Sequence, residues 1–381
     1  MAEAIPILEI GAILLGAALV GYGFRRVGLP AVVGYLLVGL LIGPFTPGYV
    51  ADRHQIQVLA DFGVVLLLFE VGIELDLRAL RREPLGIVIA VPAQVGFVTL
   101  AGTAAFVALG SGVLGAVTLG LAVALSSSIV VVNITRSRKR TADELTARAL
   151  LVWSVLQDVV TLVAATILAV LLAPGEATAA PLAFGKAVAF VAVAALVQDL
   201  VVPRLLRAVR GEQDTFLIVA VSAALATAGV GAAMFGVPLA LGAFIAGLFL
   251  SVRAEAQEAR REVLPFRDLF AVLFFVAIGS LVDPSAILRE PLWLAVILAL
   301  VVLKVFAVWG FAAIFRVPAR RPQLAVGLGQ IGEFSFVVVG LGSAAGVVSA
   351  GQFSAALGAA AITIAVSAVG ARLFPRRIPQ G

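Results

Sequence analysis

Apolar residues occur in long runs along this chain, and short groups of glycine, proline and charged residues separate the runs. Most runs are long enough to cross a bilayer as a helix, which is typical of transmembrane segments. The pattern therefore predicts an all-α polytopic membrane protein with thirteen transmembrane helices. The predicted segments are 6–24, 30–45, 57–75, 84–109, 113–135, 146–172, 182–204, 214–233, 236–252, 266–283, 291–316, 322–346 and 353–373.

The positive charges favour one orientation of these segments. Of the 27 lysine and arginine residues, 23 lie in or beside the loops that follow odd-numbered segments, and only Arg53 and Arg289 lie on the other side. Cytoplasmic loops carry the excess of lysine and arginine in membrane proteins. We therefore expect a multi-pass protein of the cell (inner) membrane, with its N-terminus outside and its C-terminus in the cytoplasm.

The odd number of segments predicts an internal repeat. If segment 182–204 is a linker, the six segments before it and the six after it enter the membrane from opposite faces. Inverted repeats of this kind are common in secondary transporters, which bind substrate near the bilayer midplane between interrupted helices. The topology alone carries this prediction, because the two halves share no evident sequence identity.

Composition narrows the classes of function. The 381 residues are 62% hydrophobic and 13% charged, with a mean hydropathy of +1.14, so little remains for a soluble domain. The net charge of +5 follows the loops rather than one surface, so we expect a lipid bilayer around the protein and no nucleic-acid partner. The first segment lacks a basic flank before it and a cleavage site, so we expect it to be retained.

The lack of suitable ligands argues against several chemistries. Cysteine is absent and His54 is the single histidine, so disulfides, thiolate sites and histidine metal clusters are excluded. We expect no cofactor, no transition-metal site and no enzymatic activity. A membrane-embedded enzyme is hard to sustain without such groups.

A polar stripe interrupts the apolar segment 145–172. Ser154, Gln157, Asp158 and Thr161 stand at positions i, i+3, i+4 and i+7, which share one face of a helix. Insertion of a charged residue at the centre of such a helix into the membrane costs about 2.5–3.5 kcal/mol, so its presence there indicates a structural or functional role. In one interpretation Asp158 is a structural, hydrogen-bonded carboxylate. In the other, a proton and a cation compete for its oxygens, and this competition couples their transport.

Lys304 lies in the middle of segment 291–316, and only three of the basic residues in the chain are lysine. Arginine keeps its charge, whereas a buried lysine can lose its proton. Lys304 is therefore predicted either to compensate charge during transport or to form a fixed ion pair with Asp158 or Glu333. Both interpretations place it near the acid.

Two segments contain residues that favour a break in the helix. Segment 113–135 contains Ser126, Ser127, Ser128 and Asn133, whose side chains can satisfy unwound backbone. Small residues also suit close helix packing without any ligand.

The matching segment 322–346 contains three glycines between Gly327 and Gly332, together with Gln330 and Glu333. The corresponding positions of the two segments, fifth and twelfth, favour a pair of crossed, broken helices. We group the three serines, Ser154, Thr161, Gln330 and Glu333 as residues that bind the cation or support the core.

Three further acidic residues are predicted to be mainly structural. Glu70 and Glu74 lie late in segment 57–75, close to Arg78 and its neighbours, and we expect structural pairing or an entrance role for them. Asp199 repeats the Gln-Asp dipeptide near the end of segment 182–204 and is expected to be structural.

Several apolar motifs, taken in order, resemble the Kef/Nap-type branch of the monovalent cation:proton antiporters over essentially the whole chain. Each motif alone has modest specificity, whereas the ordered set is highly specific. The motifs are Leu29–Pro44, Phe62–Asp76, Gly242–Gly247, Phe274–Gly279 and Gly332–Val337.

The resemblance implies a homodimer in which a core moves past a dimerisation scaffold. By position it places the ion-binding aspartate at Asp158 and the core lysine at Lys304. The implied division is a scaffold of 1–83 and 211–290, a core of 84–175 and 291–381, and a linker helix at 176–210.

The dipeptide Gln157-Asp158 is similar to that of Kef-type potassium/proton members, whereas electrogenic sodium/proton members carry two aspartates. The resemblance therefore implies exchange of one monovalent cation, potassium in preference to sodium, for one proton, with a role in pH homeostasis. Kef-type proteins often continue into a cytoplasmic regulatory domain, so a stand-alone carrier, a separate regulatory subunit and a truncated chain all stay open. A cation channel and a sensor with the same fold are alternatives, although no filter-like run of carbonyls or acidic ring is evident.

Overall fold

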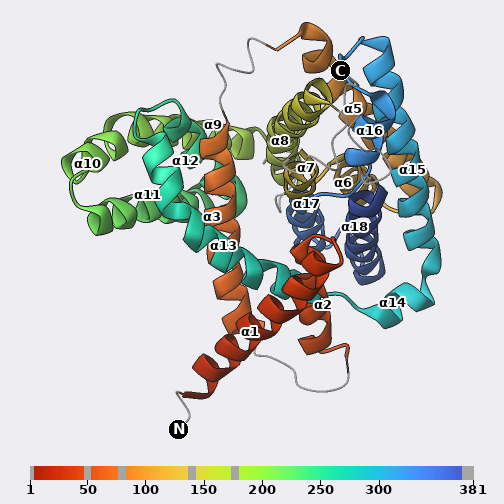
Figure 1. Ribbon diagram of the computed structural model, residues 1–381, viewed down its shortest axis with the longest axis horizontal. Coiled ribbons are helices and arrows are strands. Elements are labelled where there is room, and N and C mark those ends of the chain that lie inside the picture. Colours follow the sequence, from red (N-terminus) through yellow and green to blue (C-terminus); the bar gives the residue numbers. More distant parts are fainter. Residues whose placement is uncertain (1–3, 47–52, 76–82, 136–142, 173–179, 371–381) are drawn as a thin grey trace, which may run out of the picture. The chain divides into compact units, whose positions relative to one another are not determined.

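A computed structural model describes residues 4–46, 53–75, 83–135, 143–172 and 180–370 (Figure 1). These residues form helices and no strand. The helices of the first half are α1 (Ala4–Arg26), α2 (Ala31–Ile42), α3 (Arg53–Glu74), α5 (Leu85–Ala108), α6 (Val113–Ala124), α7 (Ser128–Thr135) and α8 (Glu144–Leu172). The others are α9 (Ala180–Leu200), α10 (Val202–Ala208), α11 (Gln213–Phe235), α12 (Leu239–Ser251), α13 (Ala256–Ser280), α14 (Pro284–Arg289), α15 (Pro291–Ile314), α16 (Arg321–Gly327), α17 (Glu333–Ala344) and α18 (Ala350–Gly370).

The helices follow the predicted apolar segments closely. Eight helical stretches in the described chain are long and apolar enough to cross a membrane, and α2, α6, α12 and α17 are shorter apolar helices. Each predicted segment coincides with one helix or with two consecutive ones. The all-helical membrane fold is thus confirmed, while the thirteen crossings and the inverted repeat stay predictions.

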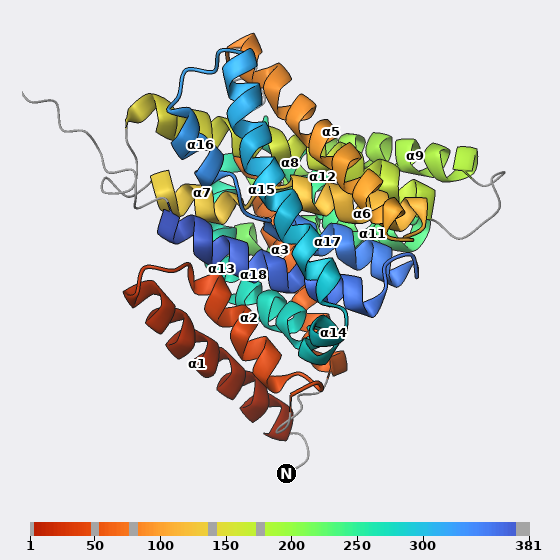
Figure 2. The same ribbon diagram turned by 90° about the vertical axis from the view of Figure 1, so that its right-hand side faces the viewer.

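Two segments are interrupted where the serines and glycines predicted a break. The first break, Leu125–Ser127, separates α6 from α7, and the second break, Leu328–Gly332, separates α16 from α17 (Figure 2). Serine side chains and glycine backbone tolerate non-helical conformations that apolar residues do not favour. Each interruption therefore follows from the local sequence.

One predicted boundary is wrong. Helix α13 begins at Ala256, well before the predicted start at residue 266, and it continues through Pro265. Its first turns are charged, which hid them from a search for apolar runs. They are helical because glutamate and arginine favour helices and find partners: Glu258 accepts from Arg210 at 2.9 Å, and Arg260 pairs with Glu70 at 2.7 Å.

The described residues within 1–50, 83–164 and 278–381 cluster into one compact unit, which we call the broken-helix unit. Helices α5 and α6 form a hairpin that is tightly packed at Gly102, where an added Cβ would lie 2.7 Å from the Cα of Gly120. Helix α15 packs on α5 and α18, and α17 packs on α6. Both breaks and the polar stripe of α8 therefore belong to a single unit.

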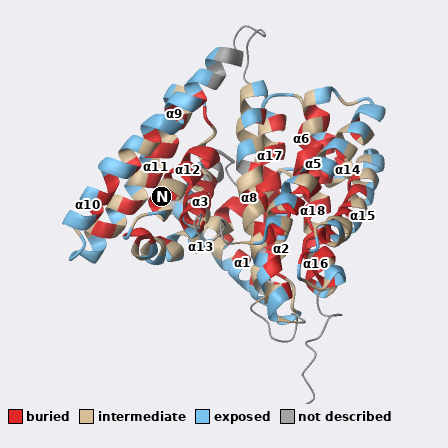
Figure 3. Cartoon of the chain, turned by 90° about the horizontal axis from the view of Figure 1, so that it is seen from above, coloured by how far each residue is buried: buried red, intermediate tan, exposed pale blue. Residues whose placement is uncertain are grey.

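Residues 51–82 and 165–277 cluster into a second unit, which we call the ion-pair unit. Its centre is α12, which Figure 3 colours largely as buried, whereas α9 carries many exposed residues. Helix α12 packs most closely on α3, where an added Cβ on Gly247 would lie 2.1 Å from the carbonyl oxygen of Phe69. The predicted division into scaffold and core concerns motion, and it stays a prediction.

The contact between α3 and α12 leads to a test of the packing. Gly247→Ala should lower the apparent Tm by at least about 2 °C, because its methyl group would meet backbone that cannot move aside. Gly229→Ala on α11 is the control, since nothing lies within 4 Å of a Cβ built there. Thermal unfolding of the detergent-solubilised protein measures both, and equal Tm values for the two variants would contradict the packing.

Candidate functional site

The polar stripe of α8 is buried as the helical spacing predicted. Ser154, Gln157, Asp158 and Thr161 are each at most 4% exposed, although much of α8 is exposed elsewhere. Thr161 Oγ1 donates to the Gln157 carbonyl at 2.6 Å, so this hydroxyl satisfies its own helix. Ser154 Oγ and Gln157 Oε1 are buried and lack a hydrogen-bond partner in the described chain. The stripe thus combines a carboxylate with unused oxygen atoms.

The two breaks contact each other directly. The Gly332 amide donates to the Leu125 carbonyl at 3.2 Å, and Ser126 Oγ donates to the Leu328 carbonyl at 2.7 Å. Gln330 Nε2 donates to the Ser127 carbonyl at 3.3 Å. Each break therefore supplies partners for backbone groups that the other break has released from helical bonding.

Gly332 allows this close approach. A Cβ at this position would lie 2.5 Å from the carbonyl carbon and oxygen of Ser126, so any side chain would push the two breaks apart. The glycine that weakened the helix in the sequence is also the residue that lets the second break contact the first.

Lys304 on α15 lies at the same crossing. Its side chain is fully buried, and its ammonium nitrogen donates to the Leu125 carbonyl at 2.5 Å and to the Gln330 carbonyl at 2.7 Å. One carbonyl belongs to each break, so Lys304 joins both breaks to α15. The sequence placed this lysine near the core but did not indicate that backbone carbonyls would bind it.

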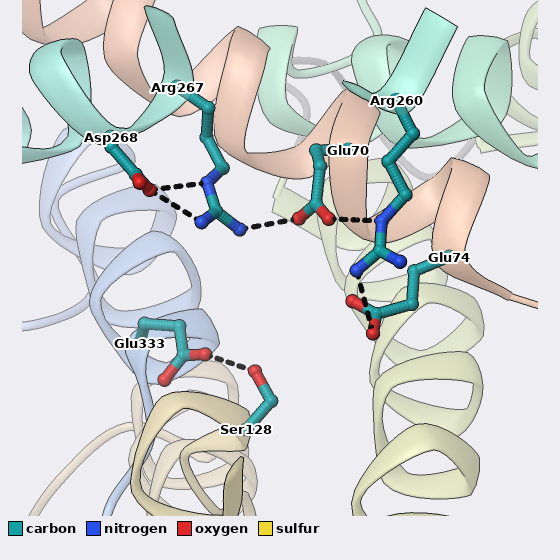
Figure 4. Close-up of polar contacts among 7 residues, drawn as sticks. All are labelled: Glu70, Glu74, Ser128, Arg260, Arg267, Asp268 and Glu333. Carbon is teal, nitrogen blue, oxygen red and sulfur yellow. Dashed lines mark hydrogen bonds and ion pairs between the residues drawn. The ribbon is translucent and has the colours of Figure 1, made fainter. Parts of the chain in front are cut away.

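Glu333 begins α17, and Ser128 begins α7. Ser128 Oγ donates to Glu333 Oε1 at 2.5 Å, while Glu333 Oε2 is buried without a partner in the described chain (Figure 4). A carboxylate at the N-terminal ends of two helices is stabilised by their dipoles. Both predicted residues therefore meet across the two broken helices.

Gln94 is a site residue that the sequence analysis missed. It is fully buried on α5, and its Oε1 accepts hydrogen bonds from Gln157 Nε2 at 2.7 Å and from Trp153 Nε1 at 3.4 Å. The signal was a single amide within an apolar segment, just after Pro92. Without a charge it did not stand out against the apolar background, and its partners on α8 lie far away in sequence.

Glu70 and Glu74 lie in the ion-pair unit. Glu70 is fully buried, and its two oxygens accept from Arg260 and Arg267 at 2.7 Å each (Figure 4). Glu74 Oε1 accepts from the same Arg260 at 2.9 Å. These partners come from α13, whereas the predicted partner Arg78 lies outside the described residues. The geometry fits the structural pairing that was preferred for Glu70.

Asp199 at the end of α9 is also paired within the ion-pair unit. Its carboxylate forms a salt bridge with Arg253, rather than with the Arg204 beside it in sequence. The Gln-Asp dipeptide of α9 therefore occurs in a different setting from that of α8. Gln198 donates instead to Thr227 Oγ1 at 3.1 Å.

Comparisons with known proteins identify relatives of the chain. The sequence model of the family described as sodium/hydrogen exchanger, transmembrane, matches residues 12–374. YbaL of Escherichia coli, assigned as a cation/proton antiporter, is 34% identical over 362 residues that cover 90% of this chain and 64% of YbaL. KefC of Cronobacter sakazakii, a glutathione-regulated potassium-efflux system protein, is 33% identical over 351 residues that cover 90% of this chain and 56% of KefC.

The chain thus spans less than two thirds of the length of these two relatives. Among solved structures, the sodium proton antiporter MjNhaP1 of Methanocaldococcus jannaschii aligns over 98% of both chains, with a TM-score of 0.76 and 16% sequence identity. At this identity the match shows a shared fold.

Removal of the Lys304 amine should destabilise the crossing of the breaks. In Lys304→Met the Gln330 carbonyl loses its buried donor, at a cost of about 1–3 kcal/mol, while the Leu125 carbonyl keeps only the Gly332 amide. Val302→Met is the control, since it places the same side chain on an exposed position of α15. Thermal unfolding should show a clearly lower Tm only for the lysine variant. Equal Tm values for the two variants would contradict the role of Lys304 in joining the two breaks.

Neutralising Glu70 should weaken the ion-pair unit. Glu70→Gln leaves two partly buried guanidinium groups without their shared carboxylate, a loss of about 3–5 kcal/mol. Glu74→Gln removes a carboxylate that is 47% exposed and that forms, among the described residues, a salt bridge with Arg260, so its effect should be much smaller. The two variants can be ranked by apparent Tm, and a milder effect at Glu70 would contradict the structural pairing.

Proposed function

Because the chain belongs to the transmembrane sodium/hydrogen exchanger family, we propose that it exchanges a monovalent cation for a proton across the cytoplasmic membrane, with Asp158 as the shared site. The observation that carries the proposal is Asp158 itself: a carboxylate only 4% exposed in α8, a helix long and apolar enough to cross a bilayer. An ionised carboxylate is costly there, and binding of a cation or a proton compensates its charge.

The cost of an ionised, buried carboxylate couples the movement of the cation to that of the proton. A cation and a proton each neutralise the carboxylate, and both need its oxygens, so one displaces the other. In an elevator-like cycle the core passes through the membrane only with the carboxylate neutralised. An empty, charged site then stays on its side of the membrane, and cation movement in one direction requires proton movement in the other.

The surrounding residues have supporting roles in this proposal. Gln157 adds a neutral oxygen ligand, because its Oε1 is buried and unused in the described chain. Lys304 and the side chains of Ser126 and Gln330 hold the two breaks together through the contacts given above. In this proposal the Asp158 site lies close to the crossing of the breaks, because Gln157 beside it donates to the Ala124 carbonyl at 3.4 Å, just before the first break.

Potassium is the favoured cation, and one proton is exchanged for each cation. Gln157 stands where a second aspartate would carry another proton, and the KefC relative is a potassium-efflux protein by its description. The distribution of arginine supports an N-terminus outside and a C-terminus in the cytoplasm. A homodimer and regulation by a cytoplasmic domain or separate subunit complete the proposal.

Substitution of the aspartate tests the proposed site. Asp158→Asn in proteoliposomes should abolish potassium/proton exchange driven by a pH gradient, because the amide binds neither a proton nor a cation as the carboxylate does. Asp199→Asn is the control: it alters the same dipeptide in α9, where the acid is paired with Arg253, and should keep exchange. Exchange that survives in Asp158→Asn would refute the proposal.

The same vesicles test the cation and the mechanism. We expect potassium to dissipate the pH gradient at lower concentrations than sodium, at a rate that an imposed voltage does not alter. Ion flux that follows voltage without a proton counterflow would indicate a channel. A folded protein that transports neither ion would indicate a sensor.

A further inference from the structure

Gln94, Gln157, Trp153 and the Ala124 carbonyl form a closed hydrogen-bonded cluster behind the polar stripe of α8. Gln157 Nε2 donates to Gln94 Oε1 at 2.7 Å and to the Ala124 carbonyl at 3.4 Å. Trp153 Nε1 donates to Gln94 Oε1 at 3.4 Å, and Gln94 Nε2 lies 3.5 Å from the same Ala124 carbonyl. The cluster joins α5, α8 and the last residue of α6 within the broken-helix unit.

Two members of the cluster can act in one direction only. An indole N–H donates and cannot accept, and a backbone carbonyl accepts and cannot donate. Trp153 therefore requires the oxygen of Gln94 on its side, and the Ala124 carbonyl requires an amide nitrogen from each glutamine. These two groups determine the orientation of both amides, because the reverse orientation would place oxygen against oxygen and nitrogen against nitrogen.

This orientation determines where the side-chain oxygen of Gln157 points. Its nitrogen is held by Gln94 and Ala124, so its oxygen is the atom turned away from the cluster. That oxygen is buried and has no hydrogen-bond partner within the described residues. A buried, unpartnered acceptor is unfavourable in a protein interior unless something else binds it.

We propose that Gln94 is a positioning residue for cation binding, which holds the Gln157 amide so that its carbonyl oxygen faces the cation carried by Asp158. The inference rests on the proposed function and deepens it. An amide is nearly symmetric in shape, but its oxygen attracts a cation and its NH₂ group repels one. The ligand is thus a small monovalent cation bound by oxygen atoms, and Trp153 supports the arrangement by orienting Gln94.

Replacement of Gln94 by an apolar residue of similar size tests this role. Gln94→Leu removes the acceptor for Gln157 Nε2, so the amide is no longer held in one orientation. We expect the KM for potassium to rise about fivefold, as one lost hydrogen bond would give, while the maximal rate changes little. A purely structural role would instead lower the maximal rate and the Tm and leave KM in place.

Trp153→Phe provides a second variant with its own outcome. It removes the indole N–H and keeps an aromatic ring, so Gln94 loses one of the two groups that orient it. We expect a smaller rise in KM, and no rise beyond that of Gln94→Leu in the double variant, because both changes act through the same amide. Should Gln94→Leu fail to fold, an unchanged KM in Trp153→Phe would by itself overturn the inference.

Gln198→Leu is the matched control. Gln198 is also fully buried and hydrogen-bonded, but it lies on α9 in the ion-pair unit. The potassium KM of this variant should equal that of the unmodified protein in proteoliposomes, measured with potassium alone. A lack of exchange by the unmodified protein would overturn the proposed function and this inference with it. Exchange with the same KM in Gln94→Leu would overturn the inference alone.

Discussion

Backbone that leaves the helical conformation inside a bilayer must find its hydrogen-bond partners within the protein, and the broken-helix unit is organised around this requirement. Two interrupted helices meet at their breaks, and each supplies donors or acceptors for the other. Lys304 adds a donor to both. An ammonium group provides three N–H donors at a single point, which suits a position where carbonyls from two chain segments converge.

The same crossing concentrates unused oxygen atoms. Among the described residues, seven buried side-chain polar atoms lack a hydrogen-bond partner, and four of them belong to Ser154, Gln157, Gln330 and Glu333. These residues lie on α8 and around the second break. Unsatisfied polar atoms are expensive in a folded protein, and the proposed function would use these oxygens as ligands for ions and protons.

The two units rely on charge in different ways. In the ion-pair unit, Glu70 is neutralised on both oxygens by arginines, and Asp199 has Arg253. The pairs of Glu70 occupy both of its oxygens. In the broken-helix unit, the buried carboxylate of Glu333 instead accepts from the Ser128 hydroxyl, a neutral partner that stabilises a carboxylate without removing its charge.

The sequence by itself determined the helical membrane fold, the two breaks and the stripe that contains Asp158. These features depend on local properties: the length of an apolar run, the weakness of serine and glycine in a helix, and the helical period. Only the tertiary structure decided which groups meet across segments distant in sequence. The partners of Lys304 are backbone carbonyls, which every residue has and which therefore give no signal in the sequence. Gln94 is an uncharged amide whose importance comes from Trp153 and Gln157 on another helix. Glu70 is paired by α13, whose charged first turns escaped a search for apolar runs, because their stability comes from partners and not from burial in lipid.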